Sequence, residues 1–257
     1  MKAAISFLGA LVLAAAALAQ TAPEPKLDDP AATYLLCLDT ARAYPDRGLE
    51  LAGKWIGLGG GEPAKHCRAI ALIGLKEYAE AGSSLEDLAK DSKRPARLRA
   101  AMLAQAGQAW LLGEDLNRAD AALTTALSLI PNDPELLIDR AEILADAGKY
   151  WEAIDDLNAA ITYAPNSADA HAFRASAYRM VDAPDMAMED AERAVMLDSF
   201  NVGALLERGI LYSQNKRPDD ARRDWMRILE LAPESDAARS ARANIEKLDL
   251  KPDGIKK

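Results

Sequence analysis

The chain has 257 residues, of which 50% are hydrophobic and only 5% aromatic, and its formal net charge at pH 7 is −9. This length allows one large domain or a row of small units that share a continuous core. A chain this acidic would repel the phosphates of a nucleic acid and the surface of an anionic membrane, so neither is an expected partner. Alanine supplies much of the hydrophobic content. Because alanine is the strongest helix former, the composition predicts an all-α fold.

Residues 1–19 resemble a secretory signal peptide. Lys2 gives a positive start, an apolar run follows, and Ala17-Leu18-Ala19 supplies the small residues at which a signal peptidase cleaves, here after Ala19. The alternative is an uncleaved membrane anchor, although an apolar run of about 14 residues is short for a bilayer. We therefore expect an exported protein, periplasmic or secreted, with no membrane span after cleavage. Residues 20–30, with three prolines, are expected to form a flexible spacer, and residues 249–257 a frayed tail.

A 34-residue period runs through the centre of the chain. Pro131 and Pro165 are 34 residues apart, and the same step defines the windows 100–133, 134–167, 168–201 and 202–235. Counting from the start of each window, place eight is always small, and place twenty is always alanine. Each window predicts two amphipathic helices joined by a turn, with small residues where the helices approach closely and a proline that ends the second helix. The residues at place eight are Gly107, Ala141, Ala175 and Gly209.

This period and these places resemble the tetratricopeptide repeat (TPR). The resemblance implies an all-α, right-handed superhelix of antiparallel helix pairs, with a concave face that binds peptides or protein segments. Ser199 stands where the other windows have proline, which is a departure from the pattern. Upstream, Lys76–Ala81 is similar to Gly148–Ala153, which predicts a degenerate repeat at 62–95, with 96–99 as a small insert. Pro45–Gly48 similarly matches Pro184–Ala187, which predicts a degenerate repeat at 29–61. The expected TPR domain is 31–248, and an amphipathic segment at 235–248 is the expected capping helix.

Arginine and aspartate recur together within the windows. Three windows have arginine at place seven and aspartate at place twenty-three, whereas the first window has Ala106 and Ala122 instead, so both partners are absent together. This correlation predicts ion pairs between helices of the stack. The alternative is a row of arginines that bind a partner. The predicted pairs are Arg140–Asp156, Arg174–Asp190 and Arg208–Asp224.

The two cysteines are Cys37 and Cys67. They fall on the first helices of neighbouring units, which pack side by side, and an even cysteine count in an exported chain favours a disulfide. His66 suggests two alternatives: a Cys–His nucleophile, or a zinc site with Cys37. Adjacent residues on a helix point about 100° apart, and no fourth zinc ligand is evident, so neither is favoured and no cofactor is expected. The four tryptophans are expected in or near the core.

The first helix of each unit should line the concave face through places five, nine and twelve. The candidate groove residues are Gln108, Leu111, Ile138, Glu142, Ser176, Arg179, Leu206, Ile210 and Ser213. Several of them could instead only pack helix against helix. Arg179 is the one basic residue in this set, so a clamp for a C-terminal carboxylate is not expected. The leading hypothesis is a non-enzymatic adaptor of the cell envelope, a monomer or weak oligomer, that binds a protein segment for assembly or maturation. The alternatives are a self-assembling structural subunit and an enzyme with unrecognised chemistry.

Overall fold

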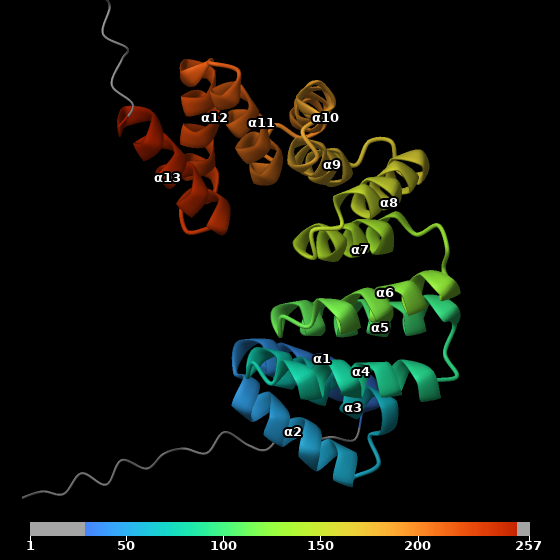
Figure 1. The fold of residues 1–257 in the computed structure, drawn as a ribbon. Coiled ribbons are helices and arrows are strands. Elements are labelled where there is room, and N and C mark those ends of the chain that lie inside the picture. The colour runs from blue at the N-terminus through green and yellow to red at the C-terminus, as the bar shows by residue number, and fades with distance from the viewer. Residues whose placement is uncertain (1–28, 251–257) are drawn as a thin grey trace, which may run out of the picture.

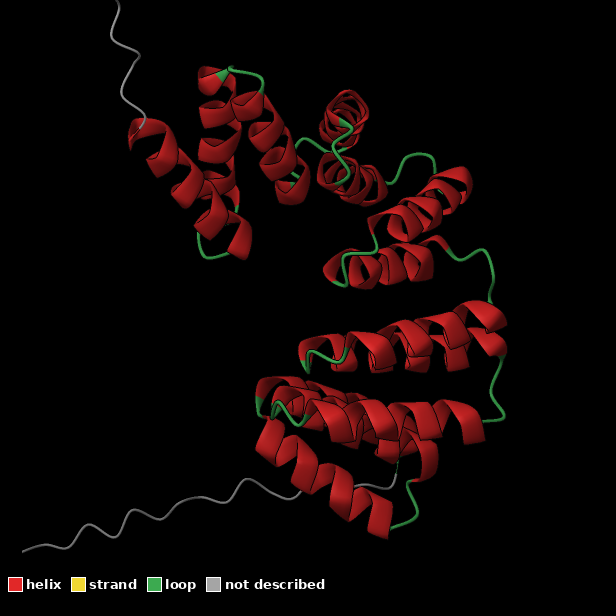
Figure 2. Ribbon diagram, viewed as in Figure 1, coloured by secondary structure: helices red, strands yellow, loops and turns green. Residues whose placement is uncertain are grey.

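The computed structural model describes residues 29–250. The predicted signal peptide, nearly all of the predicted spacer and the chain after Leu250 lie outside the described residues. Within the described part the structure has thirteen α-helices and no strand (Figure 2). The helices are α1 (Pro30–Ala43), α2 (Pro45–Gly57), α3 (Gly61–Gly74), α4 (Tyr78–Asp91), α5 (Ala96–Leu112), α6 (Leu116–Leu129), α7 (Pro134–Asp146), α8 (Tyr150–Tyr163), α9 (Ala168–Met180), α10 (Pro184–Leu197), α11 (Val202–Gln214), α12 (Pro218–Leu231) and α13 (Asp236–Leu250).

The helices form consecutive pairs that stack into a curved arc, as Figure 1 shows. In the middle of the arc, the first helices α7 and α9 face its inner side, and the second helices α8 and α10 lie on its outer side. The all-α helical repeat fold expected from the sequence is therefore confirmed. None of the described helices combines the length and the apolar character that crossing a membrane requires.

Side chains at the helix starts explain where α7 and α1 begin. Asp133 accepts hydrogen bonds from the backbone N–H groups of Glu135 and Leu136, and Pro134 occupies the first helical position, as its lack of an N–H allows. Asp29 and Pro30 start α1 in the same way. Pro30, expected at the end of the spacer, is therefore the first residue of a helix.

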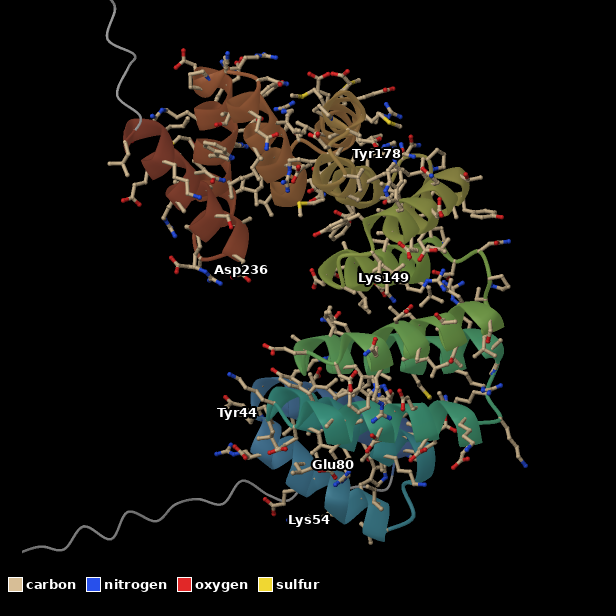
Figure 3. The ribbon with its side chains drawn as sticks, in the orientation of Figure 1. Tyr44, Lys54, Glu80, Lys149, Tyr178 and Asp236 are labelled. Atoms are coloured by element: carbon tan, nitrogen blue, oxygen red, sulfur yellow. A yellow bond between two sulfur atoms is a disulfide. The ribbon has the colours of Figure 1, made fainter. Side chains whose placement is uncertain are left out.

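The core between paired helices depends on small residues. Gly209 on α11 lies so close to Trp225 on α12 that an added Cβ would be 2.4 Å from the indole Nε1. Trp225 is only 2% exposed, so this contact fills the space between the two helices. Tyr178, labelled in Figure 3, packs against Ala187 where α9 meets α10.

The four tryptophans differ in their exposure to solvent. Trp55 and Trp110 are 3% exposed and, like Trp225, belong to the core. Trp151, in the first turn of α8, is 62% exposed, so the expectation that all four fill core positions was wrong for this one.

Two helices extend beyond their expected limits. The sequence predicted residues 96–99 to be a small insert, but they form the first turn of α5. This helix begins at Ala96 and is 17 residues long. At the other end of the stack, α13 continues to Leu250 and includes the first two residues of the expected tail.

Candidate functional site

The candidate groove residues lie on the first helices of four consecutive units: two each on α5, α7 and α9, and three on α11. Gln108 is exposed, and the other eight are half-buried. The apolar members of the set, Leu111, Ile138, Leu206 and Ile210, pack in part against the buried clusters of the stack. These side chains therefore contribute to helix packing and expose only part of their surface.

A pocket of about 510 Å³ opens between α9 and α11. Two candidate residues from the sequence, Ser176 and Leu206, line this α9–α11 pocket. Phe173 and Phe200 also line it and are 36% and 62% exposed, although the sequence did not indicate either of them as a groove residue. Phe173 is at place six of its window, which is not one of the places five, nine and twelve expected on the inner face. Two exposed aromatic rings beside a concave, largely apolar surface form a suitable seat for an apolar side chain.

Arg179 is not free to receive a ligand. Its guanidinium donates from Nε to Glu207 Oε1, and from Nη2 to Glu207 Oε2 at 3.2 Å. Glu207 is only 6% exposed, so this pair joins α9 to α11 beneath the inner surface. The one basic candidate of the groove is therefore neutralised within the protein.

The three Arg–Asp couples expected from the sequence are present as ion pairs. Arg140 Nη2 lies 2.6 Å from Asp156 Oδ1, Arg174 Nε 2.6 Å from Asp190 Oδ2, and Arg208 Nε 2.8 Å from Asp224 Oδ2. In each case a hydrogen bond to the aspartate raises the pKa of the arginine, the largest of several influences on it.

Asp190 has a second partner that the sequence did not indicate, His171 Nδ1 at 2.8 Å. All three aspartates are buried and each binds an arginine of its own unit. The pairs therefore hold helices together, which agrees with the structural interpretation of the Arg–Asp correlation.

Cys37 and Cys67 form a disulfide between α1 and α3, with their Cα atoms 6.0 Å apart. Both cysteines are fully buried. A cysteine in a disulfide is neither a nucleophile nor a zinc ligand, so this bond removes both alternatives suggested by His66.

His66 makes hydrogen bonds at both ring nitrogens. Tyr34 Oη lies 2.8 Å from Nδ1, and Gln105 Oε1 lies 2.6 Å from Nε2. Because the amide oxygen only accepts, Nε2 carries the proton and Nδ1 accepts from the tyrosine hydroxyl. Burial lowers the pKa of His66, which favours this neutral form. The three side chains line a pocket of about 460 Å³ among α1, α3 and α5.

The described residues contain no group of three or more His, Cys, Asp or Glu side chains placed to hold a metal ion. The other features of this region are an apolar pocket between neighbouring first helices, exposed aromatic rings and an ion pair satisfied within the protein.

Several known proteins with similar sequences are named as tetratricopeptide repeat proteins. No family model matches the chain. Mouse sperm-associated antigen 1 is 32% identical over 105 residues, which cover 41% of this chain and 11% of that protein. Bovine tetratricopeptide repeat protein 36 is 32% identical over 123 residues, covering 46% of this chain and 60% of that protein. The matches thus span less than two thirds of these relatives.

Solved structures show the same fold over most of the chain. MamA from Desulfovibrio magneticus RS-1 is 22% identical, with a TM-score of 0.55 over 68% of this chain and 97% of that one. A chain of the APC/C hetero-tetramer Cut9–Hcn1 is 16% identical, with a TM-score of 0.61 over 85% of this chain and 46% of that one.

The chain is similar to tetratricopeptide repeat proteins in sequence and in fold. Its matches to curated TPR proteins agree with the 34-residue period and with the stacked helix pairs. The α9–α11 pocket is lined by residues from the first helices of two adjacent repeats and from the connection before α11.

Proposed function

We propose that this TPR protein is a non-enzymatic scaffold or adaptor of the cell envelope, which binds a segment of a partner protein on its inner surface. The observation that carries this proposal is the α9–α11 pocket, where two exposed phenylalanines flank an apolar concavity. Monomeric proteins rarely leave aromatic side chains clustered in a concave surface unless a partner covers them.

A location outside the cytoplasm is part of the proposal. The sequence from Lys2 to Ala19 has the features of a signal peptide, and the buried Cys37–Cys67 disulfide suits an oxidising compartment. Periplasmic extract should therefore contain the protein with Gln20 as its first residue. N-terminal sequencing of the isolated protein tests this, and a chain that retains Met1 and stays in the cytoplasm contradicts it.

The binding function is tested by partner capture with the full chain. The pocket variant is Phe173→Ser/Phe200→Ser, which alters side chains that are already exposed and so keeps the helices packed. The matched control is Tyr163→Ser/Met196→Ser, two residues that are 52% and 76% exposed on α8 and α10, outside the pocket. Cross-linking in the native organism, followed by affinity purification and mass spectrometry, identifies the partners of each variant.

We expect the control to retain the partners of the natural chain and the pocket variant to lose them. Circular dichroism should show the same helix content for all three proteins. A folded pocket variant that keeps every partner contradicts the proposal. Capture of copies of the chain alone, with a solution mass that rises with concentration, favours the self-assembling subunit instead.

A further inference from the structure

Four acidic side chains share one face of α7, a first helix that contacts α9. Glu135, Asp139, Glu142 and Asp146 are spaced by four, three and four residues, which places them on one face of the helix. The first three occupy places two, six and nine of their repeat. On α9 the same places are occupied by Asp169, Phe173 and Ser176, all of which line the pocket. The carboxylates of α7 therefore continue the surface that contains the pocket.

No ion pair compensates these four carboxylates within residues 29–250. Two more carboxyl groups, Asp169 and Glu207, line the pocket itself. Asp169 accepts a hydrogen bond of 2.6 Å from Asn201 Nδ2, and Glu207 is paired with Arg179. The inner surface from α7 to α11 thus carries an excess of negative charge beside an apolar seat.

The pKa values of two α7 carboxyl groups are raised, which agrees with this excess of negative charge. Partial burial and then the neighbouring Asp146 and Asp139 raise the pKa of Glu142. Desolvation, followed by Glu135 and Asp133, raises the pKa of Asp139, although its side chain remains exposed. Both effects disfavour the charged carboxylate, and a cation placed nearby would oppose them.

We propose that the inner surface selects a partner segment that is both apolar and basic. An apolar side chain of the segment occupies the α9–α11 pocket, and its lysine or arginine side chains pair with the carboxylates of α7. Axes of packed helices lie about 8–10 Å apart, a distance that an extended chain covers in about three residues. The basic residues are therefore expected about three residues from the apolar anchor. This inference rests on the proposed function, because it specifies the partner of the same pocket.

Charge complementarity favours a basic partner segment over an acidic one. An acidic segment would bring further negative charge against Glu135, Asp139, Glu142 and Asp146, without a free arginine to receive it. A basic segment would neutralise them, and its long side chains would keep their apolar stems on the half-buried surface around Ile138.

The test is the binding of synthetic peptides to the full chain, followed by fluorescence anisotropy. The basic peptide has about twelve residues, with one phenylalanine about three residues from a pair of lysines. One comparison peptide carries glutamates in place of the lysines, and another carries serine in place of phenylalanine. The α7 variant is Asp139→Asn/Glu142→Gln. The matched control, Glu152→Gln/Asp155→Asn, removes the same charges from exposed positions on α8.

We expect the basic peptide to bind at least about tenfold more tightly than the glutamate peptide. The α7 variant should weaken its binding by about three- to tenfold, the control by less than about twofold, and salt near 0.5 M should remove the difference. Equal binding of the basic and acidic peptides, or an α7 variant that binds like the natural chain, overturns the inference. Self-association that only the α7 variant abolishes also overturns it, because a second copy would then be the occupant.

Failure of this inference is distinguishable from failure of the proposed function. If Phe173→Ser/Phe200→Ser abolishes capture of native partners while the α7 variant and the peptide charge have no effect, the binding function stands and the basic partner is wrong. If the pocket variant retains its native partners and binds the phenylalanine and serine peptides equally, the binding function itself is wrong.

Discussion

Arg174 on α9 and Asn158 on α8 are joined by a hydrogen bond of 2.7 Å between Nη1 and Oδ1, across the boundary between two repeats. The same guanidinium donates to Asp190 of its own repeat from Nε at 2.6 Å and from Nη2 at 2.7 Å. One unit earlier, Arg140 donates to Thr124 at 3.2 Å in the equivalent way. Arg140 and Arg174 therefore each connect their own helix pair to the pair before it.

Replacing Arg174 with methionine should destabilise the stack. Asp190 is only 4% exposed and would keep His171 as its one side-chain partner, so we expect a loss of about 2–3 kcal/mol in the free energy of unfolding. Asn158→Ala removes only the bond between repeats at an exposed site and should cost less than about 1 kcal/mol. Urea unfolding followed by circular dichroism measures both. Equal losses of unfolding free energy for the two variants would contradict the expectation that the buried Asp190 needs Arg174 as its partner.

Gly209→Ala should disrupt the contact between α11 and α12. The added methyl group would collide with the buried indole of Trp225, and such overpacking costs about 1–3 kcal/mol. The matched control is Gly53→Ala on α2, where nothing lies within 4 Å of an added Cβ. Because glycine is a poor helix former, the free energy of unfolding of the Gly53→Ala control should rise by about 0.5–1 kcal/mol. Thermal unfolding followed by tryptophan fluorescence separates the two, and a stabilised Gly209→Ala protein would show that α12 shifts freely.

The turn within each repeat has a left-handed residue at place fifteen. Gly148 has a φ of 74° there, whereas Glu114 and Lys216 adopt 61° and 58° with side chains that disfavour this conformation. We expect Lys216→Gly to raise stability by up to about 1 kcal/mol. Asn215→Gly is the control, because Asn215 has a φ of −82° and the change there only adds flexibility to the unfolded chain. Melting temperatures that rise for both variants, or for neither, would count against this explanation.

Reduction of the disulfide should weaken the N-terminal helices. A closed loop of about 30 residues contributes roughly 3–4 kcal/mol in the chain-entropy model. Dithiothreitol should lower the unfolding temperature of the natural chain and leave a Cys37→Ala/Cys67→Ala variant unchanged. Mass spectrometry of the alkylated, non-reduced protein provides a direct check, since two alkylated thiols would show that no disulfide forms.

Acid should destabilise the region around His66. In the folded protein, burial is the largest of several influences on His66 and lowers its pKa below the ordinary value of 6.5. The unfolded chain therefore binds more protons than the folded protein as the pH falls below 6.5. His66 therefore does not change the free energy of unfolding above pH 6.5. As the pH falls from 6.5 to the pKa of His66 in the folded protein, the free energy of unfolding decreases. Unfolding midpoints at about pH 7.5 and 5.5 should differ less in His66→Gln than in the natural chain. An unchanged difference would assign the acid sensitivity to other groups.

The sequence predicted the parts of this protein that depend on repetition. A side chain that recurs every 34 residues meets the same neighbour in each repeat, so Gly209 indicated a close helix contact, and the joint presence of Arg174 and Asp190 indicated an ion pair. The cysteine pair was predictable for a related reason, since the first helices of adjacent units pack side by side.

Three features were not predicted from the sequence, and two of them, the Arg179–Glu207 pair and the pocket lined by Phe200, involve contacts between one repeat and the next. Trp151 is exposed, and Arg179 is neutralised by Glu207 of the following unit. Phe200 lies in the connection between two units, and no repeat place marks it as part of a pocket. Within a helix pair the 3.6-residue period of the helix determines which side chains meet.

The sequence by itself determined the helix pairs and their internal contacts. Only the tertiary structure decided that the acidic face of α7 adjoins an apolar pocket between α9 and α11. The physical reason is that helical periodicity orients each side chain within its own repeat, whereas the rotation between repeats arises from packing across their boundary. That rotation brings Phe173 of one repeat and Leu206 of the next into the same pocket.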